Sequence, residues 1–174
     1  MHVFYSPVKN VLIYIGSEAT PDFWDTEWAR NYQVLNLKPS KKTYVTSITK
    51  KYLSSGSSIL EGGCGTGVHV KSLAEYGFKA TGIDFADKTV QWLNDNAPYL
   101  DIQYGDVRLL PFKSNTFDGY WSLGVIEHFW GGYQDILCEA YRVLKPGGHL
   151  FLTFPVISGH RQLKISNNEY RIMH

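Results

Sequence analysis

The chain of 174 residues is 44% hydrophobic and 19% charged, a composition typical of an ordinary globular domain that excludes a disordered segment. Its formal net charge of +1 gives no electrostatic reason to expect nucleic-acid binding, and no apolar run approaches the ~20 residues of a membrane span. The two cysteines form neither a disulfide framework nor a metal-binding spacing, and no signal-peptide pattern opens the chain, so we expect a cytoplasmic protein.

The beginning of the chain is β-prone. Runs at 3–5 and 11–15 flank a polar turn that contains Pro7. This arrangement predicts a hairpin or an edge arm over residues 1–20. We expect residues 21–174 to form a single domain after the arm.

From residue 20 onward, helical and strand-like patterns alternate. Thr20-Pro21 is a typical helix start, and Ser40 is expected to cap the second helix. Strands separated by helical stretches predict right-handed βαβ units, and therefore an α/β fold with a mostly parallel sheet. The predicted helices cover 22–35, 40–53, 67–76, 87–96 and 133–143, and the predicted strands cover 57–61, 79–84, 101–105, 117–123 and 148–154.

The most informative segment joins the strand predicted at 57–61 to the following helix, and its sequence is Ile59-Leu60-Glu61-Gly62-Gly63-Cys64-Gly65-Thr66-Gly67. Glycines at 63, 65 and 67 remove three Cβ atoms, which lets a ligand press against the main chain. The start of the helix also offers unpaired N–H donors. We therefore expect this turn to hold a ligand.

The spacing of the glycines argues against phosphate-containing ligands. In both possible registers a valine, Val68 or Val70, stands where the dinucleotide motif G-x-G-x-x-G needs its third glycine. No Gly-Lys-Ser/Thr follows, so the P-loop is excluded as well. Glu61, before the first glycine, suits a ligand with an ammonium group, such as S-adenosylmethionine. A nicotinamide-dependent oxidoreductase is therefore a disfavoured alternative.

Over roughly residues 56–155 the chain resembles the class I S-adenosylmethionine-dependent methyltransferases. The matching segments occur in the family's order: Glu61–Gly67, Lys79–Asp84, Tyr104–Val107, Leu110–Phe112 with Phe117–His128, and Arg142–Leu152. The resemblance implies an α/β, Rossmann-like, doubly wound, mostly parallel sheet. It also implies S-adenosylmethionine as cofactor and S-adenosylhomocysteine as product.

The resemblance further implies a role for each polar residue at a strand end. Asp84 would accept hydrogen bonds from the ribose hydroxyls, and Asp106 would accept one from the adenine amino group, with the Val107 amide as a second contact. The implied cofactor-binding residues are Glu61, Gly63, Cys64, Gly65, Gly67, Asp84, Phe85, Asp106, Val107, Ser122 and Leu123.

Several of these residues have structural alternatives. Asp84 could serve only to cap the next helix, and Glu61 could organise the glycine turn without touching the ligand. Cys64 could simply be a small side chain that fits. Trp24 and Trp28 could belong to the core, or they could form a wall near the sulfonium, where a cation–π interaction would contribute.

The chemistry that the resemblance implies is in-line transfer of a methyl group from the sulfonium to an acceptor, which depends on positioning and on exclusion of water. A hydroxyl or protonated amine would also need a general base, and Glu127, His128 and the more distant His160 are candidates. A purely structural role for His128 is the alternative. The residues Ser122-Leu123-Gly124-Val125 lack the Asn/Asp-Pro-Pro-Tyr/Phe pattern of enzymes that methylate DNA amines, which favours a small-molecule acceptor.

Only nineteen residues follow Pro155, too few for the helix and two strands that usually complete the family's sheet. We expect a truncated or naturally shortened sheet, whose exposed edge is covered by the N-terminal arm, by a partner chain, or by a second copy in a homo-oligomer. The missing elements commonly shape the acceptor pocket. The alternative function is therefore a shortened S-adenosylmethionine-binding domain without catalysis, acting as a partner or regulatory module.

Overall fold

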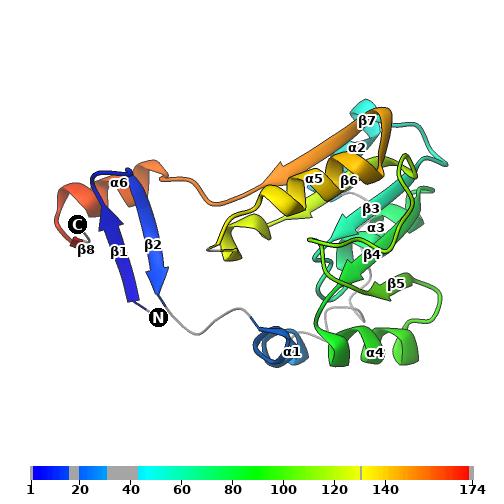
Figure 1. Ribbon diagram of the computed structural model, residues 1–174, viewed down its shortest axis with the longest axis horizontal. Helices are drawn as coiled ribbons and strands as arrows, with labels where there is room; N and C mark the ends of the chain where they lie inside the picture. The colour runs from blue at the N-terminus through cyan, green and yellow to red at the C-terminus, as the bar shows by residue number, and fades with distance from the viewer. Residues whose placement is uncertain (1, 16–19, 31–42, 130, 173–174) are drawn as a thin grey trace. The chain divides into compact units, whose positions relative to one another are not determined.

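The computed structural model describes residues 2–15, 20–30, 43–129 and 131–172 (Figure 1). The chain divides into two compact units, one formed by both chain ends, residues 1–19 and 155–174, and one formed by residues 20–154. The predicted boundary near residue 20 coincides with this division. Residues 155–174, which we expected in the larger domain, group with the N-terminal arm instead. Among the described residues, no helix combines the length and the apolar character needed to cross a membrane.

The terminal unit contains the predicted hairpin. Strands β1 (His2–Ser6) and β2 (Val11–Ile15) pair antiparallel, and β8 (Arg171–Ile172) adds to β1 in parallel. Helix α6 (Gly159–Ser166), which the sequence analysis did not predict, begins after a Ser158 side-chain cap. The pairing of β8 with β1 is the reason that the C-terminal residues group with the arm.

The larger unit is built on a five-stranded sheet in the order β5-β4-β3-β6-β7, and all neighbouring strands run parallel. Its strands are β3 (Ser58–Gly62), β4 (Lys79–Asp84), β5 (Asp101–Tyr104), β6 (Phe117–Leu123) and β7 (Leu144–Thr153). The chain moves outward from β3 to β5 and then crosses to β6 on the other side of β3. Ligands of such sheets bind where the strand order reverses, at the carboxyl ends of the strands, so the topology points to the ends of β3 and β6.

Helices cover both faces of this sheet, as the doubly wound prediction requires. They are α1 (Pro21–Ala29), α2 (Tyr44–Tyr52), α3 (Val68–Glu75), α4 (Asp87–Asn96), the short η2 (Ile126–His128) and α5 (Gln134–Val143). Neighbouring residues of β3 point to opposite faces: Leu60 packs with residues of α5, and Ile59 packs with residues of α2 and α3. Both are fully buried, which explains why this strand is a continuous apolar run and does not alternate.

Three predicted boundaries differ from the structure or extend beyond the described residues. Helix α2 begins at Tyr44, and its cap is Thr43, which forms a capping box with Thr46. The predicted cap Ser40, like the end of the helix predicted over 22–35, lies outside the described residues. Strand β7 begins at Leu144, four positions before the predicted start, because it pairs with Phe117 ahead of a register shift in the β6–β7 ladder.

The edge of the sheet at β7 has no second strand partner in the described part of the chain. Within the described ranges, β7 pairs only with β6, and the N-terminal hairpin pairs with β8 in a separate sheet. Cover of this edge by the arm, by a partner chain or by a second copy stays a prediction.

Candidate functional site

The glycine turn between β3 and α3 is held by backbone hydrogen bonds to the neighbouring strand. The N–H groups of Gly63 and Cys64 donate to the Ile83 carbonyl at 2.8 and 3.1 Å. Gly63, Gly65 and Gly67 all have positive φ, at 72°, 51° and 70°, a conformation that a residue with a Cβ rarely adopts. Gly67 precedes α3 without a side-chain cap of its own, and in the first turn of the helix the Val70 N–H donates to the buried Glu61 carboxyl group. The turn therefore has the shape and the donors that the sequence analysis expected.

A further glycine, Gly62, has a packing role that the sequence analysis missed. A Cβ at this position would collide with the Tyr120 hydroxyl, and it would come within 3.1 Å of a Val107 methyl group. Gly63 is also restricted, because its Cβ would lie 2.7 Å from a Val125 methyl group. Glycine is thus required at both Gly62 and Gly63, because side chains from β6, from the segment after β6 and from the segment after β5 leave no room for a Cβ.

Asp84 connects the glycine turn to the start of α4. Its Oδ2 accepts from the Gly65 N–H at 2.7 Å, and its Oδ1 accepts from the Ala86 N–H at 3.0 Å. The side chain is buried, and burial raises its pKa against the opposing effect of these backbone donors. Asp84 therefore organises the turn as well as the following helix, and contact with a ribose stays a prediction, as does the role of the adjacent Phe85.

Glu61 is buried directly beneath the turn, with 2% of its surface exposed. Its Oε2 has no hydrogen-bond partner among the described residues. Burial raises the pKa of Glu61 to about 8, although a backbone hydrogen bond from Val70 opposes this rise and the nearby Asp84 adds to it. An unpartnered buried carboxyl group is unfavourable, and a cationic group placed against Oε2 would remove that cost. The unpartnered Glu61 oxygen, which can accept a hydrogen bond, therefore fits a ligand with an ammonium group.

Asp106 follows β5 and is held by Arg108. The Arg108 backbone N–H donates to Asp106 Oδ1 at 2.8 Å, and the guanidinium Nε lies 3.0 Å from both carboxylate oxygens. Burial raises the pKa of Asp106, but the hydrogen bonds from Arg108 outweigh it and lower the pKa overall. The Arg108 guanidinium also lies 5.2 Å from the centre of the Phe129 ring. Val107, the predicted second adenine contact, is buried in the core cluster that contains Leu60. The predicted adenine acceptor thus has a competing partner that the sequence analysis did not foresee.

The end of β6 contributes two buried hydroxyl groups without partners in the described part of the chain, those of Tyr120 and Ser122. Ser122 pairs in register with Gly62 and so adjoins the glycine turn, and Leu123 is the last residue of the strand. Gly124, with a φ of 67°, then redirects the chain into η2. The sheet register therefore brings the end of β6 next to the glycine turn.

Both catalytic candidates of this region lie in η2. The His128 ring packs edge-to-face against Trp24, with ring centroids 4.9 Å apart. Glu127 precedes it in the same short helix, and its Oε1 faces Gly124. His160 lies on α6 and is described with the terminal unit.

Helix α1 covers the glycine turn with two tryptophans. Trp24 and Trp28 stack with ring centroids 5.2 Å apart, and atoms of the Trp28 ring lie next to Gly65. Neither tryptophan belongs to a buried cluster of the described residues. Of the two alternatives, the structure therefore excludes the core position and places Trp28 at the turn.

The attachment of α1 depends on Asp25, which the sequence analysis did not single out. Its Oδ1 accepts from the Thr89 backbone N–H at 2.8 Å and from the Thr89 hydroxyl at 2.7 Å. Its Oδ2 accepts more weakly from the Lys88 N–H at 3.4 Å, and the Lys88 ammonium forms an ion pair with Asp22 at 2.8 Å. Asp25 thus caps α4 from another helix and holds α1 over the turn. Only its position between the two tryptophans could have drawn attention to it.

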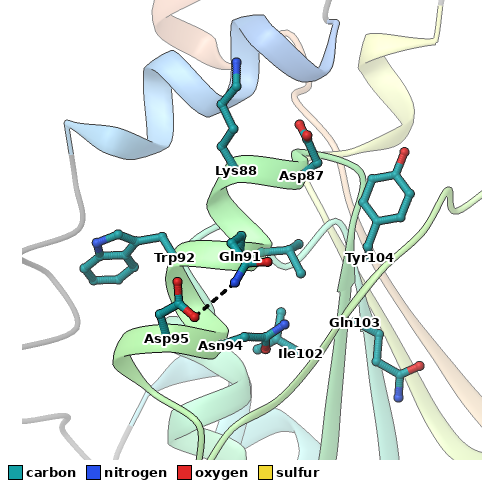
Figure 2. A pocket seen from close by; sticks show the side chains of 10 residues that line it. Asp87, Lys88, Gln91, Trp92, Asn94, Asp95, Ile102, Gln103 and Tyr104 are labelled. Atoms are coloured by element: carbon teal, nitrogen blue, oxygen red, sulfur yellow. Dashed lines mark hydrogen bonds between the residues drawn. The ribbon is translucent and has the colours of Figure 1, made fainter.

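Two hollows on the described surface of this unit are lined by residues other than the predicted cofactor residues. One of about 620 Å³ lies along α4 and β5, where Gln91 donates to Asp95 and Tyr104 projects from the strand (Figure 2). Another of about 650 Å³ lies at the seam between α1 and α4. A ligand on the glycine turn would therefore lie under α1 and in neither of these hollows.

Comparison with known proteins gives consistent results. A family model described as "Methyltransferase domain" matches residues 60–152. The chain is 33% identical over 152 residues to 27-O-demethylrifamycin SV methyltransferase of Amycolatopsis mediterranei, a match that covers 79% of this chain and 56% of that protein. It is 31% identical over 103 residues to demethylmenaquinone methyltransferase of Tropheryma whipplei, covering 56% of this chain and 41% of that protein. The chain spans about half the length of the curated relatives that it matches.

Solved structures agree on the fold. The PH0226 protein from Pyrococcus horikoshii matches with a TM-score of 0.60 and 24% identity, covering 80% of this chain and 71% of that protein. The [4+2]-cyclase SpnF matches with a TM-score of 0.61 and 21% identity, covering 78% of this chain and 61% of that protein. These likenesses support the α/β fold on which the site is built.

Proposed function

The chain belongs to the methyltransferase domain family of class I S-adenosylmethionine-dependent proteins, and from this premise we propose that it transfers the methyl group of S-adenosylmethionine to a small-molecule acceptor, leaving S-adenosylhomocysteine. The observation that carries the proposal is Glu61, a buried carboxyl group with one unpartnered oxygen beneath a turn of three positive-φ glycines. This arrangement suits the aminoacyl end of the cofactor, and the acidic side chain beneath the turn disfavours a pyrophosphate.

In the proposed complex, the turn receives the aminoacyl group and Glu61 faces its ammonium. Asp84 keeps the Gly65 N–H in place and offers its carboxylate edge to the ribose. Asp106 receives the adenine amino group, which then competes with Arg108 for the same oxygens. The remaining predicted residues, Cys64, Phe85, Val107, Ser122 and Leu123, would line the same end of the sheet.

The cofactor would supply an electrophilic methyl group on a sulfonium, and the chain would supply orientation and proton acceptance. Glu127 and His128 are the candidates for accepting a proton from the acceptor. His128 packs against Trp24 of the covering helix, which supports a position at the acceptor side of the turn. The contact also limits the rotation of the imidazole ring.

The names of the relatives support a small, partly apolar acceptor. The two curated relatives described above are named for demethylrifamycin and demethylmenaquinone, both of which are small molecules. Neither compound is assigned to this chain. Both cysteines are unpaired, which supports a reducing compartment such as the cytoplasm.

A cofactor-binding role without methyl transfer is the second candidate. One relative, 32% identical over 108 residues, is named an S-adenosyl-L-methionine-dependent Diels-Alderase. A Diels-Alderase catalyses a cycloaddition, so family membership alone does not imply methylation.

Calorimetry and a methyl-transfer assay together test both candidates. The purified chain is titrated with S-adenosylmethionine and with NAD, and is then incubated with methyl-labelled cofactor and a panel of phenols, quinols and hydroxylated macrocycles. We expect saturable binding of S-adenosylmethionine, none of NAD, and transfer of label to at least one acceptor. Binding without transfer to any acceptor supports the second candidate, and no binding of S-adenosylmethionine contradicts both.

A second copy of the chain, paired along β7, is part of the proposal. The outer side of β7 has no strand partner within the described residues, and Leu150 on this strand is 41% exposed. Unpaired strand edges tend to pair with another chain. Analytical ultracentrifugation should show a dimer, and replacing Leu150 by Lys should shift it to monomer. A monomer at all protein concentrations would remove this part of the proposal.

A further inference from the structure

Three aromatic rings form a row that starts at the glycine turn and ends at a catalytic candidate. Trp28 lies on Gly65, Trp24 stacks on Trp28, and His128 packs edge-to-face on Trp24. The row thus links the surface expected to hold the aminoacyl group with the residue expected to face the acceptor.

Trp28 meets the turn with the face of its ring. A Cβ added to Gly65 would point at the indole of Trp28. It would lie 2.9, 3.0 and 3.3 Å from the ring atoms Cζ2, Cε2 and Cη2. An approach along the ring edge would bring one atom much closer than its neighbours, whereas these three distances differ by only 0.4 Å (3.3 − 2.9). The π-face of Trp28, which carries the negative part of the ring quadrupole, is therefore the surface that covers the turn.

The position of this face is set from outside the site. Asp25 on the same helix accepts two hydrogen bonds from Thr89 at the start of α4, and Asp22 pairs with Lys88 there. Trp28 is thus presented on an anchored helix. Because ring and turn are in contact, a ligand bound on the turn must enter between them, separating them by roughly the 3.5 Å thickness of an aromatic contact.

We propose that Trp28, backed by Trp24, forms an aromatic wall against the sulfonium of the cofactor, and that it makes the site favour the positively charged cofactor over its neutral thioether product. In methyl transfer the sulfonium lies between the aminoacyl group and the acceptor, which is the interval that the ring row spans. An indole face attracts a cation within about 6 Å of its centre, and this electrostatic attraction is absent for a neutral sulfur. The inference rests on the proposed function and deepens it.

The charge dependence provides the test, because S-adenosylmethionine and S-adenosylhomocysteine differ at the sulfur by one methyl group and one charge. Calorimetric dissociation constants for both ligands are measured for the wild type, Trp28→Leu and Trp28→Phe. For Trp28→Leu we expect the affinity for S-adenosylmethionine to fall about 5- to 30-fold and that for S-adenosylhomocysteine to fall less than about 3-fold. Trp28→Phe should fall between Trp28→Leu and the wild type, because it keeps a smaller π-face.

A matched control is Trp92→Leu, which removes a tryptophan of α4 that packs on a different cluster. It should leave the ratio of the two affinities unchanged. Melting curves identify variants that fail to fold, and if Trp28→Leu is among them the more conservative Trp28→Phe still reports the ratio.

Three results have distinct meanings. A selective loss of S-adenosylmethionine binding in the Trp28 variants supports the aromatic wall. An equal loss for both ligands, or no loss, overturns it while leaving the proposed function intact. If the wild type binds neither ligand, the proposed function fails, and the wall fails with it.

Discussion

The glycine turn and helix α1 touch at Gly65, yet interactions of very different range hold them in place. The turn is fixed by its neighbours on β4, through the Ile83 carbonyl and the Asp84 carboxylate. Helix α1 is fixed by Asp25, whose hydrogen-bond partner Thr89 lies 64 positions away in the chain. The ligand-holding surface is therefore fixed by the adjacent strand, whereas its cover depends on polar contacts of Asp22 and Asp25 with the distant start of α4. Four substitutions test this contrast.

The largest effect is expected on the turn side, at Asp84. Replacing it by Ala leaves the buried N–H groups of Gly65 and Ala86 without their charged acceptor, which should lower the free energy of unfolding by about 2–4 kcal/mol. Chemical denaturation measures this loss, and cofactor affinity should fall as well. Asp84→Asn, which keeps one acceptor oxygen, should lose less. An Ala variant as stable as the wild type would show that the turn is held by other means.

Gly62 tests the packing beneath the turn. Gly62→Ala forces a Cβ into the Tyr120 hydroxyl and should reduce stability by about 2–3 kcal/mol. Tyr120→Phe removes that hydroxyl, which has no partner among the described residues, and should be close to neutral by itself. The double variant should recover only part of the loss in thermal denaturation, because the Cζ carbon of the ring would still lie 2.8 Å from the new Cβ. Simple additivity of the two changes would contradict the contact.

Asp25 tests the cover. Asp25→Ala removes the cap of α4 and should cost about 2 kcal/mol, at the upper end of the range for helix caps, because the carboxylate is buried. Asp22→Asn is the matched control on the same helix. It breaks only an exposed ion pair and should change stability far less than Asp25→Ala does. Equal effects of the two variants would mean that Asp25 does not anchor α1.

The last test concerns the pH dependence at Glu61. Its pKa is raised to about 8 in the folded protein from the ordinary 4.5, so its contribution to stability is complete below pH 4.5 and is lost as the pH rises to about 8. Glu61→Gln cannot ionise, so at pH 8 it should be more stable than the wild type. The difference should vanish near pH 5. Urea denaturation at both pH values measures it, and a pH-independent difference would contradict the buried ionisation.

In the presence of S-adenosylmethionine the same pair of proteins should behave differently. An ammonium against Glu61 favours the ionised carboxylate, so the ligand should stabilise the wild type more than the Gln variant. This second measurement distinguishes two roles for the Glu61 carboxyl group: contact with the ligand, or support of the turn alone.

Much of the sheet could be predicted because its signals are local. The predicted bounds of 79–84, 87–96 and 117–123 agree with β4, α4 and β6, where apolar runs end at Gly, Asp or Pro. The early start of β7 could not be predicted, because Pro146 and Gly147 have the composition of a turn. They lie in the register shift between the pairs Phe117–Leu144 and Gly119–His149, where Lys145 forms an ion pair with Asp118 at 2.8 Å. Local propensity describes only the segment itself, and here a neighbouring strand overrides it.

The sequence by itself determined the glycine turn, the acidic residues at the strand ends and the order of strands and helices, since each of these is encoded within a few consecutive residues. Only the tertiary structure decided that Trp28 lies over Gly65, that Tyr120 requires Gly62 to be a glycine, and that Asp106 is paired with Arg108 across a short loop. The first two contacts join residues that are distant in the chain, and the third depends on a turn geometry that spacing does not specify. Side-chain contacts of this kind form only after the parallel sheet has brought separate segments together, so no periodicity or motif within one segment records them.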